Sequence, residues 1–210
     1  MLEILKPDAN SSEKKIIARA VEILAEGGII VYPTETFYGL GADATNEKAI
    51  KKIFAVKGRD FKNPISLIIS KPEDIYPLVQ DITESAEKLM AAFWPGALTI
   101  VFAASDKVSS MLTAGTGKIG LRISSHPIAN AITQKLKRPL TATSANLSGV
   151  PECSMASDVI SQIGNKIDAI LDWGKTPGNK PSTIIDVTCN PPAILREGAV
   201  IRQAIEKYIS

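Results

Sequence analysis

Three segments of the sequence combine hydroxyl, amide and basic side chains with glycine. They are residues 33–41 (PTETFYGLG), residues 57–59 (KGR) and residues 143–149 (TSANLSG). Hydroxyls, amides and Lys or Arg side chains are the groups with which proteins hold phosphates and carboxylates. The three segments therefore predict a site for an anionic ligand.

Two of these segments follow short apolar runs, at the place where α/β proteins usually bind ligands. Thr34 and Thr36 are candidate hydrogen-bonding groups in the first. The alternative there is a turn in which the threonines bond to local backbone. Ser144 and Asn146 are the candidates in the third segment, against the alternative of a helix cap or an Asx-turn.

The KGR segment pairs a lysine point charge with the forked donors of an arginine, which suits a polyphosphate. Gly58 between Lys57 and Arg59 allows close backbone approach. The alternative is that both cations sit at the end of a helix, where positive charge is favoured in any case.

Two further arginines lie next to apolar residues. Arg122 falls inside the apolar run of residues 119–123, and Arg196 follows residues 193–195. An unpaired buried charge is costly, so Arg122 is expected to meet an anion, either a substrate carboxylate or a structural Asp or Glu. His126 precedes Pro127, which favours a helix entry over a catalytic base.

Apolar periodicity predicts the elements that position these residues. A first helix is expected after Asn10, its predicted cap, and is ended by Gly27. A second helix is expected over residues 46–56, and one closing helix within residues 202–210. Strands are predicted at residues 29–32, 65–69, 98–103, 119–123, 140–143, 169–171 and 183–187.

Alternating strands and helices predict an α/β (α+β mixed) fold of three layers with a mixed β-sheet flanked by helices. Low-complexity linkers and internal repeats are missing from the sequence. We expect one domain over residues 1–210.

Composition narrows the class of protein. There are 24 Lys and Arg against 22 Asp and Glu, so there is no global basic field, and any RNA contact should be local or indirect. Cys153 and Cys189 match neither a CxxC pair nor a zinc-ligand spacing, so we expect a reducing cytoplasm and no protein metal site. Apolar runs stay well short of the ~20 residues of a membrane span, and no membrane contact is expected.

Familiar catalytic motifs are missing. Residues 115–118 (GTGK) resemble a P-loop, but Leu112 stands at the place of its first glycine, and Ile119 follows in place of Ser or Thr. GxGxxG after a strand, HExxH and GxSxG do not occur either. Residue chemistry alone therefore reaches an anion-binding α/β enzyme.

Seven segments, in order, resemble the YrdC family over about residues 29–200. They are PTETFYGLGADAT, KGRDFKNPISLII, WPGALTIVF, IGLRISSHPIANAI, TATSANLSGVP, KPSTIIDVT and ILREGAV. Each segment is weakly specific by itself, but their shared order argues against chance similarity.

The resemblance implies a twisted open sheet with helices around a large cavity. It also implies a nucleotidyltransferase, an L-threonylcarbamoyladenylate synthase, which joins L-threonine, bicarbonate and ATP into threonylcarbamoyl-AMP and pyrophosphate. That product serves the threonylcarbamoyladenosine modification of tRNA. The implied cofactor is Mg²⁺ bound with ATP, and the implied partner is a downstream threonylcarbamoyl transferase.

The resemblance further implies a role for individual residues. L-Threonine is expected at Thr34, Arg122, Ser144 and Ser182. ATP is expected at Lys57, Arg59, Lys118, Asn146, Ser154 and Arg196. Lys57 and Arg59 are the expected catalytic cations, because phosphoryl transfer places negative charge on the phosphoryl oxygens.

The subtype follows from features within the family. The pairs Lys57/Arg59 and Ser144/Asn146 are both present, whereas relatives of less clear activity lack them. The chain has no room for the extra segments of hydrogenase-maturation relatives or for the C-terminal domain of longer synthases, so a single-domain (TsaC-type) synthase is expected. Residues 60–63 or 196–200 are candidates for a loop that closes over the intermediate.

Two other functions stay open at this point. One is a structured-RNA-binding or ribosome-maturation protein of the same fold without synthase turnover. The other is an inactive relative that binds a nucleotide.

Overall fold

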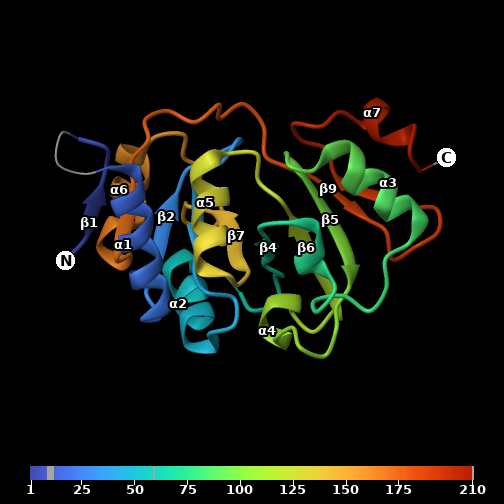
Figure 1. The fold of residues 1–210 in the computed structure, drawn as a ribbon, viewed down its shortest axis with the longest axis horizontal. Coiled ribbons are helices and arrows are strands. Elements are labelled where there is room, and N and C mark those ends of the chain that lie inside the picture. The colour runs from blue at the N-terminus through green and yellow to red at the C-terminus, as the bar shows by residue number, and fades with distance from the viewer. Residues whose placement is uncertain (9–11, 59, 210) are drawn as a thin grey trace.

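The fold is a ten-stranded mixed sheet with helices on both sides, seen in a computed structural model that describes residues 1–8, 12–58 and 60–209 (Figure 1). The strand order is β1-β8-β2-β3-β7-β4-β6-β5-β9-β10. The strands are β1 (Glu3–Leu5), β2 (Ile30–Tyr32), β3 (Gly39–Gly41), β4 (Ser66–Ile68), β5 (Leu98–Ala103), β6 (Lys118–Arg122), β7 (Leu140–Ser144), β8 (Ala169–Leu171), β9 (Thr183–Asp186) and β10 (Ala193–Arg196).

The helices lie mostly between the strands. They are α1 (Glu13–Ala25), α2 (Glu47–Lys57), α3 (Glu84–Phe93), α4 (Ser110–Thr113), α5 (Pro127–Leu136), α6 (Ala156–Ile163) and α7 (Arg202–Glu206), with 3₁₀ turns at Pro72–Ile75 and Gly164–Lys166. The sheet mixes both pairings, since β4 runs parallel to β6 while β7 runs antiparallel to β3 and β4. The expected α/β fold with a mixed sheet is confirmed.

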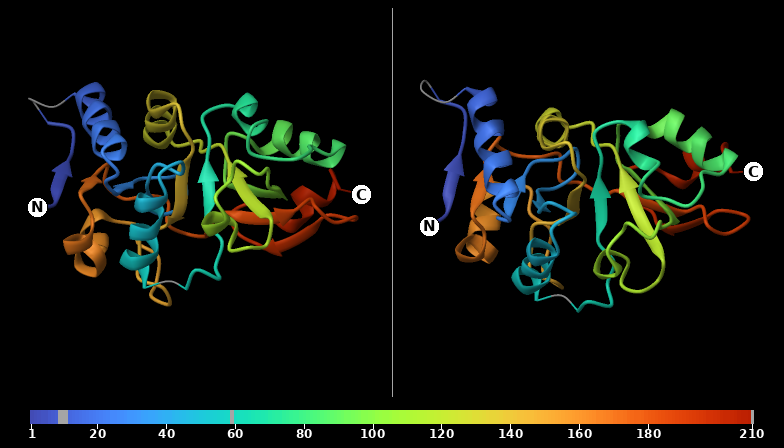
Figure 2. Two further views of the ribbon diagram at one scale, coloured as in Figure 1. Left: turned by 90° about the horizontal axis from the view of Figure 1, so that it is seen from below. Right: turned by 60° about the horizontal axis from the view of Figure 1, so that its bottom comes forward.

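Three layers follow from the alternation of buried residues along the strands. On β2, Val31 belongs to one apolar cluster, and its neighbours Ile30 and Tyr32 belong to another. The second cluster contains the apolar faces of α1 and α5, and the first contains those of α2 and α6. Figure 2 shows α1 and α5 on one side of the sheet, and α2 and α6 on the other.

Most of the predicted elements form, with small shifts at their ends. α2 begins after Asn46, whose side chain accepts hydrogen bonds from the backbone of Lys48 and Ala49, and it ends at Gly58 in the left-handed region. His126 caps α5, as its position before Pro127 suggested. Asn10, the predicted cap of α1, lies outside the described residues, and Ser12 is the N-cap residue there.

Three strands were not predicted, namely β1, β3 and β10. β3 falls within the segment that the sequence indicated as a loop. Gly39 and Gly41 enter the sheet because β3 pairs with β2 on one side and with β7 on the other. The ring of Tyr32 lies so close that a Cβ on Gly39 would come within 2.9 Å of its Cζ, so glycine is needed for packing at this position.

Candidate active site

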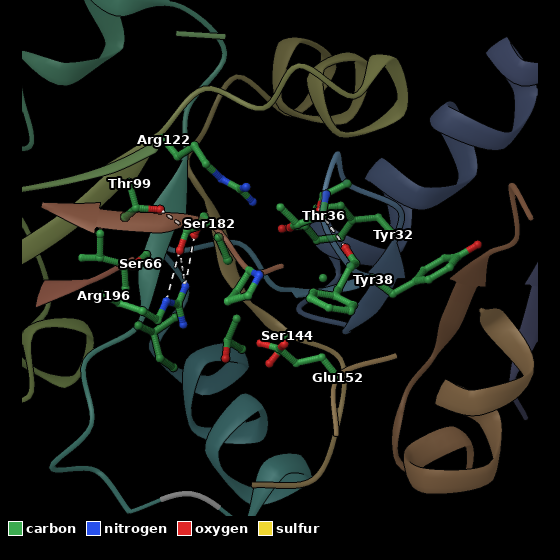
Figure 3. A pocket seen from close by; sticks show the side chains of 18 of the residues that line it. Tyr32, Thr36, Tyr38, Ser66, Thr99, Arg122, Ser144, Glu152, Ser182 and Arg196 are labelled. Atoms are coloured by element: carbon green, nitrogen blue, oxygen red, sulfur yellow. Dashed lines mark hydrogen bonds between the residues drawn. The ribbon is translucent and has the colours of Figure 1, made fainter. Parts of the chain in front are cut away.

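A cavity of about 170 Å³ opens on the sheet, lined by residues from eight strands and from the loops between them (Figure 3). Its walls are rich in hydroxyl groups and hold two arginines and one glutamate among the described residues. The lining residues are Tyr32, Thr34, Thr36, Phe37, Tyr38, Gly39, Pro64, Ile65, Ser66, Thr99, Arg122, Ala142, Thr143, Ser144, Glu152, Pro181, Ser182, Ile184 and Arg196.

The cavity continues the face of the sheet that α1 and α5 cover elsewhere. Ser66 and Ile68 share one face of β4, because side chains alternate along a strand. Ile68 packs in the cluster that includes α1 and α5, while Ser66 lines the cavity. Directly opposite Ser66 on β7 stands Ala142, another small lining residue. Small side chains at the floor of the cavity thus leave room for a ligand.

Arg122 occupies one wall at the end of β6 and is 6% exposed. Its Nη1 donates to Glu35 Oε1 at 2.7 Å, and Glu35 also accepts a hydrogen bond from the hydroxyl of Ser124. Figure 3 shows the guanidinium extending toward the cavity. The structure therefore supplies the carboxylate partner that a buried arginine requires, and it leaves Arg122 on the cavity wall.

The loop between β2 and β3 presents two threonines to the cavity. The Thr34 hydroxyl donates to the carbonyl oxygen of Phe37 at 2.6 Å and lies 3.0 Å from that of Thr36. The backbone N–H of Thr36 donates to Thr34 Oγ1 at 3.1 Å. Thr34 and Thr36 thus bond to their own turn, as the alternative interpretation held, and also line the cavity.

Arg196 lies on the edge strand β10 and reaches back over β9. Its Nε and Nη2 both donate to the carbonyl oxygen of Ser182, at 3.1 and 2.8 Å. The hydroxyl of Ser182 lies 3.1 Å from that of Thr99. Burial lowers the pKa of Arg196; Glu152 opposes this shift and the positive charge of Arg122 adds to it. Two arginines therefore line one cavity, and their N–H donors suit an anionic ligand.

Lys57 and Asn146 are brought together behind the Ser144 loop. The ammonium of Lys57, in a residue that is 3% exposed, donates to the carbonyl oxygens of Ser144 and Asn146 and to Asn146 Oδ1. The amide of Asn146 donates in turn to the carbonyl oxygens of Leu147 and Val150. In this structure both residues shape the loop that carries Ser144 to the cavity.

Lys118 and Ser154, like Lys57 and Asn146, are not among the residues that line the cavity. Lys118 begins β6, at the opposite end from Arg122, and its ammonium pairs with Asp186 at 2.8 Å. Ser154 packs beside the loop at Gly178 and accepts a hydrogen bond from the backbone N–H of Thr176. Arg59 lies outside the described residues.

The structure adds residues that the sequence had not indicated. Glu35 contacts Arg122, and Glu152, Ser66 and Tyr38 line the cavity. A buried arginine predicts some carboxylate, but nothing in the sequence shows which of the 22 acidic residues it is. Glu35 lies 87 positions away from Arg122. Only the sheet order brings these two residues together.

Two observations on the described residues bear on which catalytic groups the site contains. Burial raises the pKa of Cys153 to about 11, with Asp158 adding to the shift and Lys57 opposing it, so its thiol stays protonated at neutral pH. Groups of three or more His, Cys, Asp or Glu side chains that would hold a metal ion are missing from the described part of the chain. The cavity therefore offers a ligand mainly arginine N–H donors and hydroxyl groups.

The chain thus combines a mixed α/β fold with a cavity on its sheet that arginine and hydroxyl side chains line. The profile of the Sua5/YciO/YrdC family, described as "Telomere recombination", matches residues 22–198. The chain belongs to this family.

The relatives include several synthases. Threonylcarbamoyl-AMP synthase of Pyrococcus abyssi is 40% identical over 90% of this chain, and that of Vibrio parahaemolyticus is 37% identical over 86%. The chain spans 56% of the length of the former and 97% of the latter. Thus the matched region makes up little more than half of some relatives and nearly all of others.

Solved structures agree with this relationship. P. abyssi Sua5 complexed with L-threonine superposes on the whole chain with a TM-score of 0.93 at 38% identity, and the chain covers 61% of it. Escherichia coli YciO matches 95% of the chain at a TM-score of 0.83 and 28% identity, with 96% of YciO covered. Among the described residues, none of the helices has the length and apolar character needed to cross a bilayer.

Proposed function

We propose that this chain is a threonylcarbamoyl-AMP synthase, which makes threonylcarbamoyl-AMP and pyrophosphate from L-threonine, bicarbonate and ATP. One observation carries the proposal: a buried arginine, Arg122, faces a small cavity whose other walls present hydroxyl groups. The name of the synthase relatives and the threonine complex of P. abyssi Sua5 support it.

The size of the cavity suits an amino acid. Pockets that enclose drug-sized ligands have volumes of roughly 300–1,000 Å³, whereas this cavity has about 170 Å³. We assign the cavity to L-threonine, with its carboxylate at Arg122 and its polar groups near Thr34, Ser144 and Ser182. ATP then extends beyond the cavity along Arg196.

The proposed reaction needs no protein nucleophile. The amine of threonine adds to bicarbonate with loss of water, and an oxygen of the resulting carbamate attacks the α-phosphorus of ATP as pyrophosphate leaves. Negative charge builds on phosphoryl oxygens in the transition state, so nearby fixed cations lower the barrier. Arg196 on the cavity wall fits this role, and Lys57 and Arg59 are the further cations that the family resemblance assigns to it.

The remaining ATP assignments rest on the resemblance. Asn146 holds the Ser144 loop, and Lys118 and Ser154 lie apart from the cavity lining. Substitution of each by alanine, with the KM for ATP as the readout, tests these assignments one by one.

Mg²⁺ is proposed to enter with ATP. Mg²⁺ prefers oxygen ligands and is usually held by one or two carboxylates together with substrate phosphates. Glu152 is the carboxylate among the described lining residues and fits such a role. Bound Mg²⁺ would neutralise charge on the phosphates.

The experiment is release of pyrophosphate from ATP by the purified chain, with L-threonine and bicarbonate present or omitted one at a time. Release that requires both is expected, as is direct detection of threonylcarbamoyl-AMP. Release that is indifferent to threonine would contradict the proposal. ATP binding in calorimetry without threonine-dependent product would indicate an inactive relative.

The proposed partners follow from the product. A threonylcarbamoyl-AMP synthase in the cytoplasm would supply a transferase that modifies tRNA, and any RNA contact of its own would be local. The alternative function, structured-RNA binding or ribosome maturation without turnover, predicts tight RNA binding that weakens steeply with salt. The formal net charge of +2 argues against it.

A further inference from the structure

Arg122 forms an ion pair with the carboxylate of Glu35. Its Nη1 lies 2.7 Å from Glu35 Oε1, and the exposed fractions of the two side chains are 8% and 14%. Glu35 belongs to the loop between β2 and β3, whereas Arg122 ends β6, three strands away from β3 in the sheet. The ion pair thus connects the loop between β2 and β3 with β6, although β6 pairs with neither β2 nor β3.

The carboxylate of Glu35 is itself held in place. Its second oxygen accepts a hydrogen bond from the hydroxyl of Ser124. Its neighbours Thr34 and Thr36 are joined by a backbone-to-hydroxyl bond of 3.1 Å, and both line the cavity. Glu35 is not a lining residue, and its carboxylate contacts Arg122 and Ser124 instead. The turn that presents Thr34 to the ligand therefore also sets the position of the carboxylate.

A guanidinium is a planar fork of five N–H donors, so fixing one nitrogen restricts the direction of the others. Bidentate recognition of a carboxylate depends on that direction. Without Glu35, Arg122 would keep its charge but lose the contact that orients its plane. Both oxygens of Glu35 already accept hydrogen bonds, which favours this indirect role over proton abstraction from the substrate.

We propose that Glu35 is a positioning residue: it acts through Arg122 and sets the selectivity of the cavity for a ligand with a free carboxylate. The inference rests on the proposed function, in which the carboxylate belongs to L-threonine. It predicts that loss of Glu35 weakens binding of the threonine carboxylate more than it weakens binding of the other groups of threonine or of ATP.

The test compares L-threonine with L-threoninamide, which has the same amine and hydroxyl but no carboxylate. Glu35→Gln keeps the shape, an acceptor for Arg122 and a donor toward Ser124, but removes the charge. We expect the KM for L-threonine to rise about tenfold or more, because a neutral amide holds the guanidinium less firmly than a carboxylate does, and small misplacements of a binding group cost about one to two orders of magnitude. The KM values for L-threoninamide and ATP should change less than about twofold in the same assay.

The ratio of kcat/KM for threonine to that for threoninamide should then fall about tenfold in Glu35→Gln. Ser124→Ala keeps the charge of Glu35 but removes the hydroxyl that donates a hydrogen bond to it. We therefore expect a smaller fall in the same ratio. Glu84→Gln is the matched control, because Glu84 forms an exposed ion pair with Lys88, and it should leave the ratio unchanged.

A parallel loss on both substrates, with the ratio unchanged, would overturn the proposal and make Glu35 a structural residue only. If the melting temperature shows that Glu35→Gln does not fold, the ratio in Ser124→Ala decides between the same two outcomes. Wild-type protein without threonine-dependent pyrophosphate release would instead overturn the proposed function. Calorimetric binding of L-threonine to wild type and Glu35→Gln then tests the positioning role without turnover.

Discussion

The ammonium nitrogen of Lys57 lies 2.9 Å from the backbone carbonyl oxygen of Asn146 and 3.2 Å from Oδ1 of the same residue. The ammonium can only donate hydrogen bonds, since it has three N–H donors and no acceptor. It also donates to the carbonyl oxygen of Ser144. A lysine at the end of α2 thereby fixes the turn that follows β7, and Ser144 at the start of that turn lines the cavity.

Lys57→Met should therefore reduce both stability and activity. Removal of the ammonium takes a donor from the carbonyl oxygen of Asn146, whereas that of Ser144 still accepts from the backbone N–H of Asn146; the loss of one buried donor costs about 1–3 kcal/mol of unfolding free energy. Threonine-dependent pyrophosphate release should fall by about two orders of magnitude as the Ser144 loop shifts. Urea unfolding and the pyrophosphate assay measure the two effects.

Lys52→Met is the matched control for Lys57, because Lys52 lies on the same helix and donates to the carbonyl oxygen of Gly27 at 2.8 Å. It should retain activity within about threefold, since that contact lies away from the cavity lining. Equal losses of activity in both variants would mean that Lys57 has no particular link to the site.

Arg196→Lys should weaken ATP use more than threonine use. The two nitrogens of Arg196 that donate to the Ser182 carbonyl oxygen form a fork that lysine cannot reproduce. We expect the KM for ATP to rise about tenfold, with the KM for L-threonine changed less than about threefold. Arg202→Lys on the exposed helix α7 serves as the control. A selective rise in the KM for L-threonine would contradict this assignment and would show that Arg196 binds the amino acid and not ATP.

Protonation of His126 should destabilise the fold below neutral pH. Its Nδ1 accepts the backbone N–H of Ile128 at the start of α5, and burial lowers its pKa, with Glu35 opposing the shift. A histidine with a lowered pKa in the folded state contributes stability above its unfolded pKa of roughly 6.5 and loses it as pH falls. Unfolding free energy should thus fall between pH 8 and pH 5.5.

His126→Asn tests this explanation, because asparagine caps a helix but does not titrate. The variant should gain stability relative to wild type as pH drops from 8 to 5.5. Thr83→Ala removes the non-titrating cap of α3 and should lower stability equally at both pH values. A His126→Asn difference that is the same at both pH values would contradict the role given to His126.

Asp186 should contribute stability that is lost in acid. Burial raises its pKa, but the bonds from Lys118 and Thr188 together outweigh burial and lower it. A carboxylate with a lowered pKa stabilises the fold above its unfolded value of about 3.9 and ceases to do so as pH falls through its folded value. Asp186→Asn should show a weaker fall in melting temperature between pH 5 and pH 3. An unchanged pH profile would show that other carboxylates control the acid transition.

Much of the sheet could be predicted from apolar runs, since β5 and β8 begin and end where those runs do. β3 could not. Glycines disfavour strands by propensity, and only the neighbouring strands and the Tyr32 ring explain their presence at positions 39 and 41.

The candidate site was predictable in its residue types but less so in its contacts. The cost of burying Arg122 indicated an anionic partner, and the structure shows Glu35. Lys57 was expected at phosphates, and its contacts with the Ser144 loop come from residues almost 90 positions away, beyond the reach of local patterns. Pairings of this kind depend on the order of strands in the sheet, which the sequence alone did not specify.

The cavity walls come from residues as far apart as Tyr32 and Arg196, and from strands near the middle of the sheet and at its edge. Such a site has a high contact order, because no single hairpin or helix pair contains it. It can exist only after both halves of the sheet have joined through β7 and β4. Ligand binding is therefore coupled to folding of the whole sheet, and a bound substrate stabilises the entire fold in proportion to the logarithm of its concentration.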